Sequence, residues 1–184
     1  MKRQDPNKEH LQSIINLYNK GLLQQALSES SQMLERFPNS VILYNIAGAS
    51  NAALMQFDAA IESYKQALRI KPDFADAYYN MGVALNDKGD PEAAIESYKQ
   101  ALRIKPDFAE GHSNLGTAFQ LLNQIEQAVA SYETAISLKK DLNTAISGLG
   151  KALLKKGEHS VGLDKLRQGE GSILFNIKSG LSIK

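Results

Sequence analysis

Histidines and neighbouring carboxylates are the first residues in this sequence that could support chemistry. The three histidines, His10, His112 and His159, lie too far apart in sequence to form a metal-binding motif. His10 and His112 occupy the same place of a repeated pattern, which indicates a packing or capping role. Asp87 and Asp90 fall at a predicted helix–helix turn, where helix capping explains them. We therefore expect no metal site and no cofactor.

A glycine-rich stretch, residues 148–151, is similar to the end of a phosphate-binding loop. That loop needs a glycine and a Ser or Thr where this sequence has Ala145 and Ala152, so no phosphate site is predicted. The chain has no cysteine, which excludes thiol chemistry. No basic stripe accompanies the tyrosines, so we expect no nucleic-acid partner. The sequence predicts no catalytic site, and we expect the protein not to be an enzyme.

The elements that would position any site are marked by an internal repeat. The seventeen residues AAIESYKQALRIKPDFA occur twice, at 59–75 and at 93–109, which is a spacing of 34 positions. Within the second copy, apolar residues recur every three or four positions, as expected for an amphipathic helix. Asp90 and Pro91 suit the start of that helix, and Pro106 suits its end.

A second helix is predicted to follow each copy. Asp107 and Glu110 have the spacing of a capping box, and Asp73 with Asp76 repeats that signal one period earlier. One period is therefore helix, turn, helix, turn. Two such helices alone cannot bury their apolar faces, whereas a stack of identical pairs forms a continuous core.

The 34-residue pattern resembles the tetratricopeptide repeat (TPR) family. The best-matched repeat, 75–108, carries the family's residues at Tyr78, Met81, Gly82, Leu85, Ala94, Tyr98, Ala101 and Pro106. Repeats 41–74 and 109–142 match nearly as well, and the end repeats 7–40 and 143–176 are degenerate. The resemblance implies an all-α, right-handed superhelix of about five helix pairs over residues 1–176, in which Gly82 and Gly116 allow close helix approach. Residues 169–184 are expected to form a C-terminal tail or cap.

The resemblance also implies a binding surface, because the first helix of each repeat lines the inside of the superhelix in this family. The residues expected to bind a peptide are Asn45, Asp76, Tyr79, Asn80, Val83, Asn86, Ser113, Asn114, Thr117 and Gln120. Asn80 and Asn114 are open to two interpretations, a solvated polar face or local cap, and recognition of an extended backbone by amide groups.

Repeats 75–108 and 109–142 are similar to those that precede the catalytic part of O-linked N-acetylglucosamine transferases, where such asparagines form a backbone-binding ladder. The resemblance does not reach a catalytic part. A carboxylate clamp, the family's other known mode, is not expected, because Asp76 and Glu110 carry the wrong charge at inward positions. We therefore expect an interaction scaffold that binds a peptide or protein segment. The alternative is a self-assembling structural protein, and so a homo-oligomer.

The C-terminal stretch has a different pattern. Ile173, Phe175 and Ile177 alternate with more polar residues, and Ser179-Gly180 could turn the chain. A short hairpin or an extended apolar tail is predicted. It could cap the last helix, offer a strand to a second copy or partner, or begin a larger domain.

The overall composition gives few further constraints. Apolar residues make up 43% and charged residues 22%, as in ordinary folded proteins. The net charge is +1, but residues 1–138 carry −4 and residues 139–184 carry +5. This asymmetry fits either a solvated surface or head-to-tail attraction between copies. The charged start and the lack of a long apolar run predict a cytoplasmic protein without direct membrane insertion.

Overall fold

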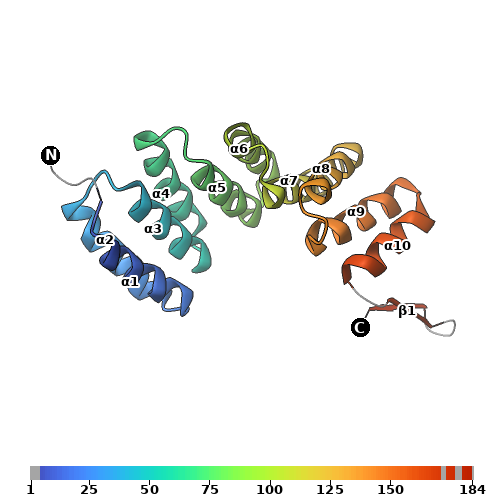
Figure 1. The fold of residues 1–184 in the computed structure, drawn as a ribbon, viewed down its shortest axis with the longest axis horizontal. Helices are drawn as coiled ribbons and strands as arrows, with labels where there is room; N and C mark the ends of the chain where they lie inside the picture. The colour runs from blue at the N-terminus through green and yellow to red at the C-terminus, as the bar shows by residue number, and fades with distance from the viewer. Residues whose placement is uncertain (1–4, 171–172, 177–179, 184) are drawn as a thin grey trace. The chain divides into compact units, whose positions relative to one another are not determined.

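The computed structural model describes residues 5–170, 173–176 and 180–183, and for the last two segments it describes the backbone only. Within this part the chain forms ten helices and two strands. They divide into two compact bodies, an N-terminal unit (Met1–Ile104) and a C-terminal unit (Lys105–Lys184). Each unit is built from helix pairs (Figure 1).

The N-terminal unit contains three helix pairs. Its helices are α1 (Lys8–Asn19), α2 (Leu23–Arg36), α3 (Val41–Ala53), α4 (Phe57–Ile70), α5 (Ala75–Lys88) and α6 (Pro91–Ile104). Each helix packs against the next one along the chain, and α3 also lies against both α1 and α5. The first helices of the three pairs therefore form one row.

The C-terminal unit contains two helix pairs and a hairpin. Its elements are α7 (Ala109–Leu121), α8 (Ile125–Leu138), α9 (Asn143–Lys156), α10 (His159–Glu170), β1 (Ile173–Asn176) and β2 (Gly180–Ile183). The first helices α7 and α9 lie side by side. The strands pair antiparallel, with Ile173 opposite Ile183 and Asn176 opposite Gly180. Ile177 and Ser179 of the predicted hairpin lie outside the described residues.

A tyrosine ring fills the space beside a glycine in three of the helix pairs. A Cβ atom built on Gly82 would lie 2.6 Å from the ring of Tyr98, and one on Gly116 would lie 2.9 Å from the ring of Tyr132. Gly48 and Tyr64 repeat this contact in α3 and α4. The predicted close approach at Gly82 and Gly116 is therefore confirmed, and what approaches each glycine is a buried aromatic ring.

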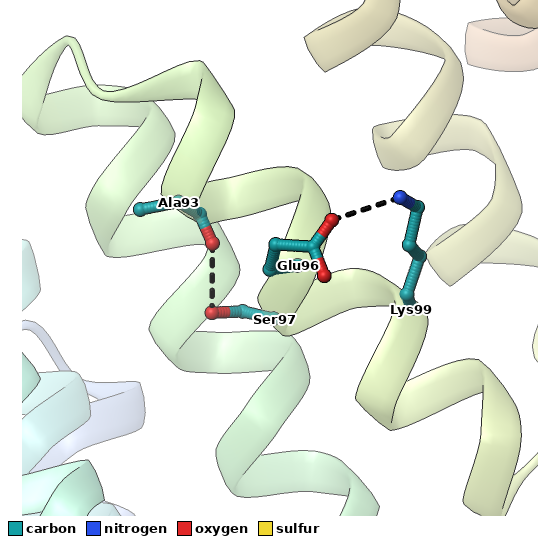
Figure 2. Close-up of polar contacts among 4 residues, drawn as sticks. All are labelled: Ala93, Glu96, Ser97 and Lys99. Atoms are coloured by element: carbon teal, nitrogen blue, oxygen red, sulfur yellow. Dashed lines mark hydrogen bonds and ion pairs between the residues drawn. The ribbon is translucent and has the colours of Figure 1, made fainter.

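The two identical sequence copies bury the same Ala-Ile, Tyr and Ala positions, but their surface side chains make different contacts. Ser97 Oγ donates to the carbonyl of Ala93 at 3.0 Å (Figure 2), and Ser63 makes the same bond in the first copy. On the surface, Glu96 pairs with Lys99 at 2.8 Å (Figure 2), whereas Glu62 accepts a hydrogen bond from Gln66. Exposed polar side chains in identical sequences thus contact different partners.

Helix starts agree with the sequence in one case and differ in another. Asp90 Oδ1 accepts from the backbone N–H of Ala93 at 3.0 Å, and Pro91 begins α6, as predicted. The capping box predicted from Asp107 and Glu110 is wrong. Helix α7 begins at Ala109 after Phe108, which makes no side-chain cap, so Asp107 stands one residue too early to cap it. Helix α5 begins in the same way.

Candidate functional site

Two predicted amide side chains meet in the N-terminal unit. Asn80 Nδ2 on α5 donates to Asn45 Oδ1 on α3 at 3.1 Å, and both side chains are partly exposed. An amide pair joined by one hydrogen bond keeps further capacity to donate and to accept. Because α3 and α5 are neighbouring first helices, this pair bridges two successive repeats on the surface where binding residues are expected.

The other predicted residues of this unit lie on α5, the helix that carries Asn80. Tyr79 packs on Tyr98 with ring centroids 6.0 Å apart and planes tilted by 49°. Val83 and Asn86 are partly buried, and Asp76 is exposed. The Oδ1 atom of Asn86 is buried and has no hydrogen-bond partner among the described residues. A buried oxygen that accepts no hydrogen bond lowers the stability of the folded protein, so packing alone does not explain an asparagine at this position.

The predicted residues of the C-terminal unit form a hydroxyl-rich network. Thr117 Oγ1 lies 3.1 Å from the hydroxyl of Tyr132, and that hydroxyl donates to Gln120 Oε1 at 3.0 Å. Ser113 is 3% exposed, and its Oγ lies 3.5 Å from Thr144 Oγ1 on α9. Asn114 lies on the same helix and is partly exposed. Burial raises the pKa of Tyr132, so its hydroxyl stays neutral at physiological pH.

A recess opens over this network, and we call it the α7–α9 recess. Its volume is about 440 Å³, and it is lined by Thr117, Gln120, Tyr132, Asn143, Thr144, Ser147, Gly148, Lys151 and Gly169. Gly148 makes room for its floor, because a Cβ there would lie 2.4 Å from the ring of Tyr132. At the equivalent place of the two preceding repeats the sequence has Asn80 and Asn114.

Ion pairs neutralise several charged residues of the C-terminal unit. Lys151 Nζ lies 2.8 Å from Glu170 Oε1, and the Glu170 side chain is only 19% exposed. Lys139 Nζ lies 2.9 Å from Glu110 Oε1, and this hydrogen bond lowers the pKa of Glu110 and raises that of Lys139. Lys155 lines an adjoining hollow together with Thr117 and Gln120, and forms no ion pair with the described residues.

Sequence reasoning missed the half of this surface that lies on α9. The predicted binding residues come only from repeats 41–74, 75–108 and 109–142. The same positions in repeat 143–176 are Thr144, Ser147, Gly148, Lys151, Leu154 and Lys155, and all of them except Leu154 line the recess or its adjoining hollow. The periodicity therefore contained the signal, although the degenerate end repeat obscured it.

Other kinds of site find no support in the described part of the chain. No group of three or more His, Cys, Asp or Glu side chains there could hold a metal ion. His112 Nε2 lies 2.9 Å from the carbonyl oxygen of Pro106, a local contact of the kind predicted for it. None of the helices searched there combines the length and the apolar character required to cross a membrane.

Family comparisons agree with this architecture. A TPR repeat model matches residues 53–89 and 84–123, and a tetratricopeptide repeat model matches residues 109–142. Residues 53–142 of the chain carry tetratricopeptide repeats. Among curated proteins, these repeats are similar to the probable UDP-N-acetylglucosamine–peptide N-acetylglucosaminyltransferase SEC of Arabidopsis thaliana, with 37% identity over 76 residues. That match covers 41% of this chain and 8% of SEC, so the chain spans only a small part of this relative.

Solved TPR structures share the fold. The crystal structure of MamA has a TM-score of 0.76 at 24% identity, over 84% of this chain and 90% of MamA. YrrB, described as a TPR protein with an unusual peptide-binding site, has a TM-score of 0.71 at 17% identity, over 91% of this chain and 86% of YrrB. The predicted all-α TPR fold class is thus confirmed, and the resemblance of its middle repeats to O-linked N-acetylglucosamine transferases is matched by SEC.

Proposed function

We propose that the protein is an interaction scaffold, without catalysis of its own, that binds an extended peptide or protein segment on the first helices of its repeats. TPR proteins of similar architecture support an interaction role, and YrrB is described as having a peptide-binding site. The proposed binding residues are the ten predicted from the sequence, from Asn45 on α3 to Gln120 on α7. The proposal places this interaction in the cytoplasm and involves no nucleic acid.

The hydrogen-bonded pair of Asn45 and Asn80 is the observation that carries this proposal. Their single mutual bond uses one donor and one acceptor, which leaves N–H groups and a carbonyl oxygen for a ligand. An extended peptide presents the complementary N–H and C=O groups along its backbone, so amides can bind it without reading its sequence.

The test uses a peptide selected from a displayed library of random dodecapeptides against the full chain. We expect the double variant Asn80→Ala, Asn114→Ala to bind the selected peptide at least tenfold more weakly, since each substitution removes a hydrogen bond to the ligand. The matched control is Gln66→Ala, Gln127→Ala, which removes one amide from a second helix of each unit. Equal binding by wild type and the Asn double variant, with unchanged circular dichroism, would refute the role of these asparagines.

Self-assembly through the C-terminal hairpin is the second candidate. β1 and β2 form a two-stranded sheet and pair only with each other among the described residues. Unpaired strand edges can accept another strand, and an isolated hairpin is marginal in water. A second copy of the chain could therefore supply both a strand and a covering surface.

Light scattering over a range of concentrations distinguishes this candidate. If the hairpin drives assembly, the mass of the full chain rises with concentration, and a chain that ends at Glu170 stays monomeric because α10 is complete there. A full chain that remains monomeric throughout rules the candidate out. If both chains assemble equally, assembly occurs through another surface.

A further inference from the structure

An apolar hollow, which we call the Ile42 hollow, opens at the start of α3 in the N-terminal unit. Its volume is about 430 Å³, and it is lined by Asp5, Val41, Ile42, Ile70, Lys71 and Phe74. The side chain of Ile42 is 40% exposed, so this unit covers it only in part. Apolar surface that stays open to water gains free energy when a partner covers it.

The isoleucine departs from the pattern of the repeat. In the following two repeats the same position is acidic, with Asp76 and Glu110. Glu110 pairs with Lys139 at 2.9 Å. Lys71 stands at the place of Lys139, but the residue at the place of Glu110 is Ile42, and Lys71 forms no ion pair with the described residues. The isoleucine therefore gives up an ion pair and exposes apolar surface, and neither change stabilises the unit.

The rim of the hollow carries two opposite charges. The buried hydroxyl of Ser40 donates to Asp5 Oδ1 and accepts from the backbone N–H of Leu43 at 3.3 Å, which holds the carboxylate in place. Lys71 Nζ lies over the ring of Phe74, 5.6 Å from its centroid. A carboxylate accepts several hydrogen bonds and an ammonium donates three, so both groups keep capacity for a ligand.

The hollow adjoins the pair of Asn45 and Asn80. Ile42 and Asn45 stand three residues apart on α3, which places them on one face of that helix. The amides can hold a backbone without reading its sequence, whereas an apolar hollow selects one kind of side chain. A segment held at the amide pair can therefore place a side chain in the hollow one turn away.

We propose that the Ile42 hollow is the specificity subsite of the scaffold, and that it takes an apolar side chain flanked in the bound segment by one basic and one acidic residue. The apolar side chain covers Ile42, the basic residue pairs with Asp5, and the acidic residue pairs with Lys71. The arrangement differs from a carboxylate clamp, because its anchor is apolar and Lys71 follows a second helix. This inference rests on the proposed scaffold function and specifies its ligand.

Exchanging Ile42 for the acidic residue of the next repeat tests the anchor. Asp76 shows that the repeat accepts Asp here, and an acidic side chain suits the first turn of a helix. Ile42→Asp removes the apolar surface and gives Lys71 a carboxylate, so it should weaken binding of a selected peptide at least tenfold. Met55→Asn is the control, because Met55 is 75% exposed, does not line the hollow, and has the left-handed backbone that Asn123 has at the same repeat position.

The experiment selects dodecapeptides from the displayed library on the full chain and on each variant. Fluorescence anisotropy then measures the affinity of one selected peptide and of a twin in which its apolar anchor is Ala. We expect Leu, Ile, Met or Phe to be enriched between opposite charges on the wild type and on Met55→Asn. The twin should bind the wild type at least tenfold more weakly, whereas Ile42→Asp should bind peptide and twin equally.

Circular dichroism checks that each variant folds. Ile42→Thr, with the residue type of Thr144 at the same repeat position, is a second variant with the same expected direction. An equal loss for the twin on all proteins would place the anchor elsewhere and overturn the subsite. Selected peptides that lack an apolar residue between opposite charges would also overturn it, and would leave the scaffold function standing.

Two further outcomes would contradict the proposal in different ways. If the full chain self-associates, and Ile42→Asp abolishes this association without changing peptide affinity, a second copy occupies the hollow and the peptide subsite is wrong. A failure to select any peptide would overturn the scaffold function together with its subsite.

Discussion

The same position of the repeat is occupied by Asn80 in the N-terminal unit and by Gly148 in the C-terminal unit, and it produces two different surfaces. Asn80 reaches across to Asn45 and forms a polar bridge between neighbouring first helices. Gly148 has no side chain, so the face of Tyr132 and its hydroxyl network form the floor of a recess. At this repeat position an asparagine bridges two first helices, whereas a glycine lets a tyrosine ring from the preceding helix form the floor of a recess.

Replacing Gly148 by Asn would give both units the same residue at this repeat position, and we expect it to have the largest effect on stability. The new Cβ would lie 2.4 Å from the ring of Tyr132, which is fixed by burial, so we expect a loss of about 3 kcal/mol in the free energy of unfolding. The reverse exchange, Asn80→Gly, loses a hydrogen bond and should cost about 1 kcal/mol. Urea unfolding followed by circular dichroism measures both, and equal costs would contradict the packing described for Gly148.

Replacing Gly169 by Ala tests whether the degenerate end repeat is built for closer packing. The family pattern has Ala here, and Ala is the better helix former by about 1 kcal/mol. The structure nevertheless predicts a net loss of about 2 kcal/mol, because the Cβ would lie 2.8 Å from the backbone nitrogen of Ser147. The exposed neighbour Gln168→Ala should leave the urea midpoint unchanged. A stabilised Gly169→Ala variant would show that the family pattern outweighs this contact.

The tyrosine hydroxyl of the recess can be compared with the hydroxyl at the same repeat position of the N-terminal unit. The comparison measures how much the free energy of unfolding falls when each hydroxyl is removed. Tyr132→Phe leaves Gln120 and Thr117 without this partner, and should cost about 1 kcal/mol in the free energy of unfolding. Tyr98→Phe serves as the comparison in α6. If Tyr132→Phe unfolds at the wild-type urea concentration, the network contributes little to stability, although it could still serve binding.

The smallest expected effect concerns the exposed ion pair of Glu110 and Lys139. The pair lowers the pKa of Glu110 in the folded protein, so its small stabilisation is present at neutral pH and is lost as the pH falls through that lowered pKa. A side-chain NMR titration should place the pKa of Glu110 below the ordinary glutamate value, and Lys139→Gln should move it back upwards. An unchanged pKa in that variant would show that the pair does not persist in solution.

Much of the fold was predictable because the same helix-pair pattern recurs several times along the sequence. Small residues recur at fixed positions of the repeat, so the resemblance to the TPR pattern predicted close helix approach at Gly82 and Gly116, although it did not predict that the rings of Tyr98 and Tyr132 fill the space beside them. The capping box at Asp107 was wrong because a cap depends on where the helix begins, and a shift of one residue moves its side chain away from the backbone N–H groups. Surface pairing was not predictable either, since Glu62 and Glu96 choose different partners within identical sequences.

The candidate site was predictable only in part. Counting inward positions led to Asn45 and Asn80, which the structure brings together, and to Thr117 and Gln120, which line the recess. The recess itself depends on the absence of a side chain at Gly148 and on a ring from a different helix. Neither appears in a list of chemically capable residues, so the sequence did not predict that Lys151 lines a recess.

The most direct test of the scaffold is an NMR map of the full chain with a peptide selected from the displayed library. The account predicts that backbone amide shifts change on the first helices, namely α3, α5, α7 and α9. Changes confined to the second helices or to the hairpin would contradict it. So would the absence of any peptide that binds more tightly than a scrambled control.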